Sequence, residues 1–240
     1  MKPFTSFHRL LDRLLPHHCP ICDGEVADYG LCSACWSGLS FVTPPFCRTC
    51  GRPLVGAQLH DLCGPCIAKP SLLRYQRAIV RYDEASKSLI LPFKHAARLD
   101  LTKLLALLMK PSFEALITDD HIVMPVPLHF TRRFMRGYNQ SAELARTLCH
   151  MTNRNTQFDN VSLYRRKRTI PLARHNAKKR KAILRGAFAM RHAPVAHLQN
   201  RPVLLIDDVM TTGQTCEAAA RSVLSSGARA VDVLTFARIL

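Results

Sequence analysis

Short apolar runs alternate with segments of helical periodicity along the second half of the chain. Runs at residues 122–124, 203–206 and 231–236 are typical of strands that are buried on both faces of a parallel sheet. Residues 141–150 and 215–226 carry apolar side chains at helical spacing. Strands and helices in alternation imply parallel strands joined by crossover helices. The pattern therefore predicts an α/β domain whose parallel sheet is flanked by helices.

Eight of the ten cysteines form four CxxC pairs near the start of the chain. Two intervening residues let both thiolates of a tight turn face one ion, and tetrahedral Zn²⁺ takes four such ligands. Four thiolates close a site to substrate, so the metal is expected to be structural. We expect two such Zn²⁺ sites, built from Cys19, Cys22, Cys32, Cys35, Cys47, Cys50, Cys63 and Cys66.

Other interpretations of the cysteines are open. Disulfide frameworks are typical of small secreted domains, and redox CxxC chemistry uses a single motif, so four motifs in a chain without a signal peptide favour metal. The pairs can share ions in chain order or interleaved, and we expect chain order. His17, His18 and His60 lie beside the pairs and are alternative ligands.

The composition is that of a globular protein with a strongly basic charge balance. Hydrophobic residues make up 48% of the chain, and 34 Lys and Arg against 17 Asp and Glu give a net charge of +17. The longest apolar stretch, residues 101–109, is too short to span a membrane, and the N-terminus lacks the apolar core of a secretory signal. We expect a cytoplasmic protein without a transmembrane segment, either free or peripheral to the inner face of the cell membrane.

The positive charge is concentrated in one segment. Between Asp159 and Asp207 there are 12 Lys and Arg residues and no carboxylate. Such a segment is either a solvated face or a surface that attracts phosphates and nucleic acid. The basic block from Arg165 to Arg191 is therefore a candidate surface for single-stranded DNA.

A polar string follows the apolar run at 203–206. Ligands of open α/β sheets bind at the carboxyl ends of strands, where Asp207 and Asp208 offer acceptors to the vicinal hydroxyls of a ribose. The helix N-terminus that follows favours an anion, so the string fits a phosphorylated ribose. A solvated Asp pair before a Thr-capped helix is the alternative. The ligand-binding residues expected after the pair are Thr211, Thr212, Gly213, Gln214 and Thr215.

The string from Val203 to Thr215 resembles the phosphoribosyl-pyrophosphate signature of the type I phosphoribosyltransferases. Nearly the whole chain resembles the ComF/GntX family of competence and DNA-utilisation proteins, which pair an N-terminal zinc ribbon with a phosphoribosyltransferase-like domain. The resemblance implies a type I phosphoribosyltransferase-like fold after a small Cys-rich double zinc-ribbon module. It also implies a role in DNA uptake or utilisation, phosphoribosyl pyrophosphate with Mg²⁺ as the ligand, and other DNA-uptake proteins as partners.

The resemblance assigns roles to basic residues outside the string. The segment 125–140 is similar to the family's pyrophosphate-binding loop, and clustered arginines at a strand end suit bidentate bonds to phosphate. Lys94 matches a family position near the cleft. Leu172 and Ile183 stand where relatives often carry Gln and Asn, so the polar contacts of those positions are not expected here. The arginines implied as ligands are Arg132, Arg133 and Arg136.

Two functions fit these residues. The first is an enzyme that transfers a phosphoribosyl group to an acceptor that the sequence does not identify, with Asp207 and Asp208 as catalytic carboxylates and Mg²⁺ bridging the pyrophosphate and the ribose hydroxyls. The second is a non-catalytic factor that binds single-stranded DNA and reuses the fold. The expected organisation is a leader over 1–18, a double zinc ribbon over 19–70 and a phosphoribosyltransferase-like domain over 71–240.

Overall fold

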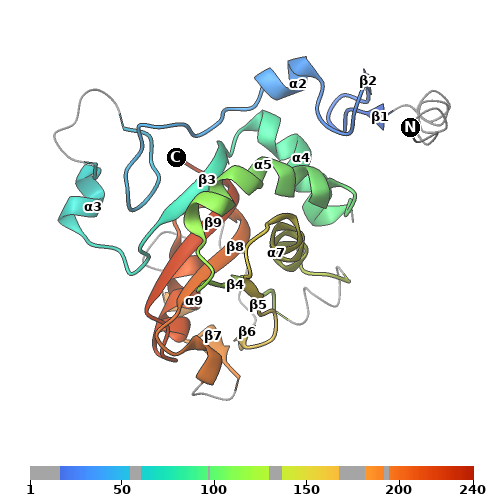
Figure 1. Cartoon of the computed structure of the whole chain (residues 1–240). Coiled ribbons are helices and arrows are strands. Elements are labelled where there is room, and N and C mark those ends of the chain that lie inside the picture. The colour runs from blue at the N-terminus through green and yellow to red at the C-terminus, as the bar shows by residue number, and fades with distance from the viewer. Residues whose placement is uncertain (1–16, 55–60, 97, 130–136, 168–181, 192–194) are drawn as a thin grey trace.

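The computed structural model describes residues 17–54, 61–96, 98–129, 137–167, 182–191 and 195–240 (Figure 1). The leader expected over residues 1–18 lies outside this part of the chain, apart from His17 and His18. Those two residues form strand β1.

Five parallel strands form the central sheet, in the order β3-β9-β8-β4-β5. This arrangement confirms the predicted parallel sheet. The strands are β3 (Gln76–Arg81), β4 (Ile122–Pro125), β5 (Gln157–Phe158), β8 (Pro202–Met210) and β9 (Ala230–Arg238).

Helices cover both faces of the sheet (Figure 1). One face packs against α4 (Glu84–His95), α5 (Leu101–Leu116) and α7 (Gln140–Met151). The other face packs against α9 (Gln214–Leu224) and a smaller antiparallel pair of strands. The pair consists of β6 (Leu163–Arg165) and β7 (Phe188–Met190), and a 3-10 turn, η2 (Ala196–Leu198), precedes β8.

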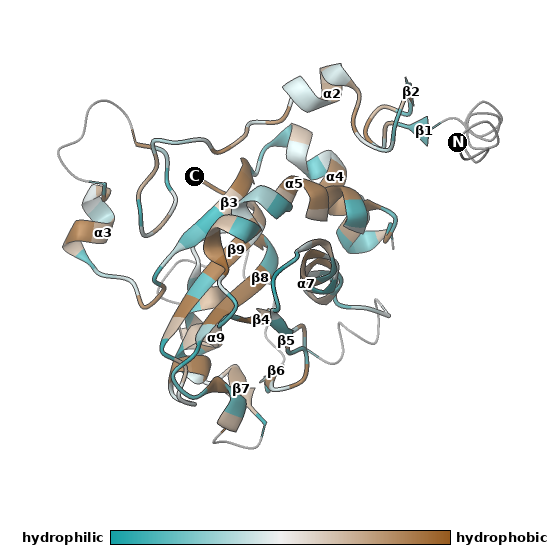
Figure 2. Ribbon diagram, viewed as in Figure 1, coloured by the Kyte–Doolittle hydropathy of each residue, from teal (hydrophilic) through white to brown (hydrophobic). Residues whose placement is uncertain are grey.

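Strand β8 explains why the sheet needs two covering layers. Leu204 and Ile206 point into the core under α4, α5 and α7, whereas Val203 and Leu205 point into the core under α9. All four side chains are fully buried. Because successive strand residues face opposite sides, a continuous apolar run requires apolar neighbours on both faces. Figure 2 shows hydrophobic colour along much of the central strands.

The N-terminal module consists of short elements around the cysteines. They are β1 (His17–His18), β2 (Glu25–Val26), α2 (Ser33–Ser37) and α3 (Gly64–Ala68). Between α2 and α3, the backbone N–H of Val42 donates to the Ile79 carbonyl at 2.8 Å, and that of Arg81 donates to the Ser40 carbonyl at 2.8 Å. This segment therefore covers the exposed edge of β3, where unpaired backbone groups would otherwise invite association.

The predicted fold class is confirmed: a parallel sheet flanked by helices follows a Cys-rich module with two four-cysteine clusters. One detail differs from the sequence prediction, because the strand expected to end at Ile206 continues as β8 to Met210. Asp207 and Asp208 therefore lie within the strand, and the turn begins at Thr211. Across the residues that the structure describes, every helix is too short or too polar to cross a membrane.

Candidate functional site

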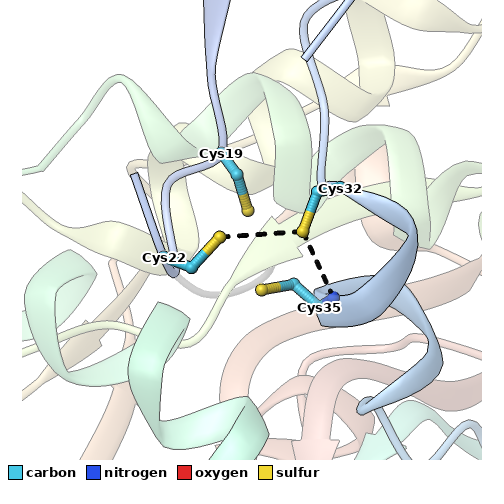
Figure 3. Close-up of side chains that lie close together, drawn as sticks. All are labelled: Cys19, Cys22, Cys32 and Cys35. Atoms are coloured by element: carbon cyan, nitrogen blue, oxygen red, sulfur yellow. Dashed lines mark hydrogen bonds between the residues drawn. The ribbon is translucent and has the colours of Figure 1, made fainter. Parts of the chain in front are cut away.

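The cysteines form two separate four-sulfur clusters in chain order. In each cluster the four Sγ atoms lie within 4.8 Å of one another, and Figure 3 shows the first set converging on a common centre. The expected in-order pairing is confirmed. No histidine joins either cluster among the described residues, which include His17 and His18 but not His60. The first cluster is Cys19, Cys22, Cys32 and Cys35, and the second is Cys47, Cys50, Cys63 and Cys66.

Both clusters fit a structural zinc ion. Sulfur atoms 2.3 Å from a tetrahedral zinc lie about 3.8 Å apart, and the Cys22–Cys32 and Cys50–Cys63 Sγ separations are both 3.6 Å. Burial would raise the pKa of Cys47, but N–H groups of Cys50 and Cys63 donate to its sulfur and lower that pKa to about 6. A thiolate is the form that ligates metal, so the Cys47 sulfur is in its metal-binding form at neutral pH.

Asp207 and Asp208 lie toward the carboxyl end of β8, at the edge of the sheet where α7 and α9 begin. The Ser141 hydroxyl, from the first turn of α7, donates to Asp207 Oδ1 at 2.9 Å. The backbone N–H of Asp208 donates to the same oxygen at 2.9 Å. Asp208 Oδ1 lies 3.0 Å from Lys94 Nζ. The strand, two helices and the lysine thus meet at the Asp pair.

Lys94 reaches the Asp pair because the end of α4 is fixed to the start of α7. The Tyr138 hydroxyl donates to the Phe93 carbonyl at 2.8 Å, and the Gln140 amide donates to the Lys94 carbonyl at 3.1 Å. The last carbonyls of a helix have no partner within the helix, so these two bonds satisfy the end of α4. Phe93 is fully buried below, which holds Lys94 against the sheet edge.

The loop of residues 211–213 connects β8 to α9. Gly213 is the N-cap of α9 and has φ 75°, a left-handed conformation that favours glycine. Within the described residues no side chain caps the first N–H groups of α9, and the Thr211 and Thr212 side chains are exposed. A helix start of this kind presents N–H donors and a positive dipole to an anion.

Asp207 is harder to ionise than an ordinary aspartate. Burial and the neighbouring charge of Asp208 raise the pKa of Asp207 to about 7, against the opposing effects of Lys94 and Ser141. Two adjacent carboxylates with one lysine leave an unbalanced negative charge near neutral pH. This arrangement attracts a cation or a hydroxyl-bearing ligand.

The described architecture matches known proteins over nearly its whole length. The family described as a double zinc ribbon domain matches residues 10–69. DNA utilization protein YhgH from Escherichia coli is 31% identical over an alignment 234 residues long, which covers 94% of this chain and 99% of that protein. The chain belongs to the ComF family of competence and DNA-utilisation proteins.

Other members of the ComF family align over similar lengths. Competence protein ComFC from Bacillus subtilis is 29% identical, with 88% of this chain and 85% of that protein covered. Competence protein F from Haemophilus influenzae is 28% identical, with 92% and 96% covered. A hypoxanthine phosphoribosyltransferase from Staphylococcus aureus superposes with a TM-score of 0.34 at 12% identity, over 57% of this chain and 62% of that chain. The fold assignment rests on the strand order itself.

Some residues that the ComF resemblance singles out lie outside the described part of the chain. These are Arg132, Arg133, Arg136 and Leu172, together with the middle of the basic block at 168–181. By contrast, the structure brings Lys94, Asp207, Asp208 and the loop before α9 to one edge of the sheet.

Ser141 is a site residue that sequence reasoning missed. It is 3% exposed, and its hydroxyl bonds to the Asp pair. Its position two residues after the capping Asn139 was the available signal. In a parallel α/β sheet each helix that follows a strand begins at the carboxyl edge, so the first turn of α7 was bound to lie near the polar string after β8.

Proposed function

We propose that this chain binds phosphoribosyl pyrophosphate, or a related sugar phosphate, together with Mg²⁺, and acts in DNA uptake or utilisation. The observation that carries the proposal is the meeting of Asp207, Asp208 and Lys94 with the uncapped start of α9 at one strand end. The role in DNA uptake or utilisation follows the names of the ComF relatives.

Different residues at this edge of the sheet bind different parts of the ligand. Asp207 and Asp208 accept hydrogen bonds from the 2- and 3-hydroxyls of the ribose. The N–H groups at the start of α9, with the hydroxyls of Thr211, Thr212 and Thr215, donate to the phosphate attached to the sugar, and Gly213 lets the backbone approach it. Asp207 and Asp208 would also hold Mg²⁺, which would supply positive charge to offset the negative charge of the pyrophosphate.

A transfer reaction would break the bond between the anomeric carbon and the pyrophosphate oxygen. Pyrophosphate leaves with the electron pair, and a nucleophile of the acceptor forms the new bond to carbon. Orientation and electrostatic stabilisation are the main contributions that a protein makes to such a step. Lys94 brings a positive charge to the leaving-group side, and Arg132, Arg133 and Arg136 are predicted to add to it. The proposal names no acceptor for the phosphoribosyl group, and it covers ligand binding with or without transfer.

Isothermal titration with phosphoribosyl pyrophosphate and Mg²⁺ tests the proposal. The double variant Asp207→Asn/Asp208→Asn should lose at least tenfold in affinity, because the amides cannot accept as strongly or hold a cation. Asp119→Asn, at an exposed carboxylate outside this edge, is the matched control and should bind like the natural chain. Equal affinity in all three proteins would rule out the assignment of this site.

Single-stranded DNA binding by the basic block is a second candidate function. Arg165 lies 5.3 Å over the Phe188 ring and Arg191 lies 5.3 Å over the Tyr164 ring, so the β6–β7 pair carries arginines along its length. Arg166 and Arg185 are exposed beside it. Positive grooves with aromatic groups are typical of single-strand binders.

A salt series separates the two functions. Binding of single-stranded DNA through phosphate contacts should weaken steeply as salt rises, and the double variant Arg166→Ala/Arg185→Ala should reduce that slope by about two. The same variant should leave the affinity for phosphoribosyl pyrophosphate unchanged. DNA binding that is insensitive to both salt and the substitutions would exclude this surface.

A further inference from the structure

The second cysteine cluster is built onto the edge of the central sheet. The backbone N–H of Gln76, the first residue of β3, donates to the Thr49 carbonyl at 2.7 Å. The Arg77 guanidinium donates to the Arg48 carbonyl at 2.8 Å. Gly51 has φ 67°, and a Cβ at this position would lie 2.4 Å from the Gln76 carbonyl oxygen. The turn that carries Cys47 and Cys50 therefore lies directly against β3.

Arg238 joins this cluster to the strand that carries the candidate site. Its guanidinium donates to the Cys50 carbonyl. At the end of β9, Arg238 pairs with Met210, the residue before the loop of residues 211–213, and Ile239 N–H donates to the Met210 carbonyl at 3.0 Å. One side chain thus connects a cysteine ligand to the strand end from which the loop leaves.

Gln76 provides a second connection. Its side chain is 6% exposed, and its amide nitrogen donates to the Ser71 hydroxyl at 3.3 Å. Its amide oxygen lies 3.5 Å from the position that a Cβ of Gly213 would occupy. The residue whose main chain holds the cysteine turn therefore has its side chain beside the N-cap of α9.

Charge strengthens these connections. One Zn²⁺ with four thiolates has a net charge of −2, and a buried guanidinium beside it offsets that charge. Arg238 is partly buried, and its Nε has no hydrogen-bond partner among the described residues. The charge of a loaded second cluster would hold this side chain in place.

The first cluster makes its contacts elsewhere. The Tyr29 hydroxyl, between Cys22 and Cys32, donates to the Asp100 carbonyl at 2.5 Å, and Lys103 lies 5.3 Å over the Tyr29 ring. These residues lie at the start of α5, and Figure 1 shows α2 and α3 well apart. The two clusters therefore offer an internal comparison.

We propose that zinc in the second cluster, acting through Arg238 and Gln76, holds the loop of residues 211–213 in its ligand-binding form. Zinc at this cluster and the phosphorylated ligand then bind cooperatively, whereas zinc at the first cluster is independent of the ligand. Arg238 and Gln76 are positioning residues. The inference rests on the proposed binding of a sugar phosphate at this loop.

Zinc release from the full chain to a chromogenic chelator tests the coupling. Because coupling between two ligands is reciprocal in binding free energy, phosphoribosyl pyrophosphate with Mg²⁺ should raise the affinity for one zinc ion by roughly tenfold, read as slower release of that ion, and leave the other unchanged. Cys22→Ser, which removes a ligand of the first cluster, should retain the ligand-sensitive ion. If calorimetry shows binding and both ions leave at unchanged rates, the inference is wrong. If the zinc-loaded chain does not bind at all, the proposed function itself fails.

Arg238→Met tests the connection directly, because it keeps side-chain length and removes the donor and the charge. Expected results are faster loss of one zinc ion and faster amide exchange over residues 211–216 by mass spectrometry. Arg229→Met is the control. Arg229 precedes β9 and lies 3.8 Å from Asp120, so this variant should change neither zinc release nor amide exchange. A folded Arg238→Met variant with unchanged zinc release and unchanged exchange would overturn the proposal. If that variant does not fold, Gln76→Met, which removes the second connection and leaves the cysteine turn in place, decides by the same two measurements.

Discussion

The hydroxyl of Ser141 donates to Asp207 Oδ1 at 2.9 Å, although 66 residues separate the two in the chain. The bond joins the first turn of α7 to β8, so two successive crossover units meet at one carboxylate. The N–H of Asp208 donates to the same oxygen. These two donors fix the orientation of Asp207 and favour its ionised form, while burial opposes ionisation.

Replacing Ser141 should therefore raise the pKa of Asp207 above its value of about 7. Ser141→Ala removes a hydrogen bond to the charged form, and a carboxyl-selective NMR titration should show the upward change. Affinity for phosphoribosyl pyrophosphate with Mg²⁺ at pH 7 should fall about fivefold, the effect of one hydrogen bond. Ser141→Thr keeps the hydroxyl and should titrate like the natural chain; a Thr variant that shifts as far as the Ala variant would contradict this role.

The raised pKa of Asp207 also predicts how binding depends on pH. A carboxyl with a pKa of about 7 is mostly protonated at pH 6 and mostly ionised at pH 8. A ligand that needs both carboxylates ionised should bind about tenfold more tightly at pH 8 than at pH 6. The phosphates of the ligand titrate as well, so the pH dependence of affinity is measured for the natural chain and for Asp207→Asn, and the difference between the two is compared with this expectation. Parallel profiles for the two proteins would show that Asp207 does not control binding.

The Asp207 carboxyl should change the stability of the fold in the opposite direction: ligand binding strengthens as pH rises, whereas stability falls. The folded chain holds the Asp207 proton more tightly than the unfolded chain does, because the folded pKa lies above the usual value for aspartate. The resulting stabilisation is complete at acid pH and is lost as pH rises through about 7. Between pH 6 and 8 the free energy of unfolding should fall by about 1 kcal/mol relative to Asp207→Asn, measured by urea denaturation.

Local signals made much of this protein predictable from its sequence. CxxC spacing is a property of single turns, and chain-order pairing brings together turns that are near neighbours, so both clusters followed from the sequence. The fully buried run in β8 likewise marked its strand, because a short run of four successive apolar residues is typical of a strand covered on both faces.

Long-range contacts were harder to predict. The contact of Lys94 with Asp208 depends on how the end of α4 is held by Tyr138 and Gln140, and no spacing in the chain encodes that. Helices α4 and α5 contain Pro92 and Pro111, residues that normally end a helix, so their pattern is weak despite their extensive burial. In both cases tertiary packing outweighs the local preference.

Gly213 should be sensitive to substitution for conformational rather than steric reasons. A Cβ there would meet its neighbours at 3.5 Å or more, which is ordinary contact, but φ is 75°. Gly213→Ala should therefore lower the free energy of unfolding by about 1 kcal/mol and weaken phosphate binding as the loop adjusts. Gly64→Ala, where a Cβ meets nothing within 4 Å and φ is not positive, is the control. A neutral effect at both glycines in thermal unfolding would contradict the strain argument.

Asp232, on β9, pairs with the buried His121 and with Arg74, whose side chain is exposed in part. Its carboxylate is fully buried, accepts from Arg74 Nε at 3.0 Å and lies 3.2 Å from His121 Nε2. The Thr118 N–H donates to His121 Nδ1 at 2.8 Å, so the proton of this imidazole belongs on Nε2, facing Asp232. Burial raises the pKa of Asp232, but His121 and Arg74 outweigh it and hold the pKa below its usual value.

Asp232→Asn should consequently destabilise the fold by about 2 kcal/mol, because it weakens the contact of the buried His121 and leaves the Arg74 guanidinium, which is solvated in part, without its counter-charge. The effect should shrink as pH falls through the lowered pKa of Asp232, where the natural carboxylate becomes protonated as well. Asp232 pairs with Leu204, whereas the candidate site begins at Asp207 near the other end of β8. Ligand affinity of the folded variant should therefore match that of the natural chain. A variant that keeps full stability by denaturation but loses ligand binding would place Asp232 in the site rather than in the framework.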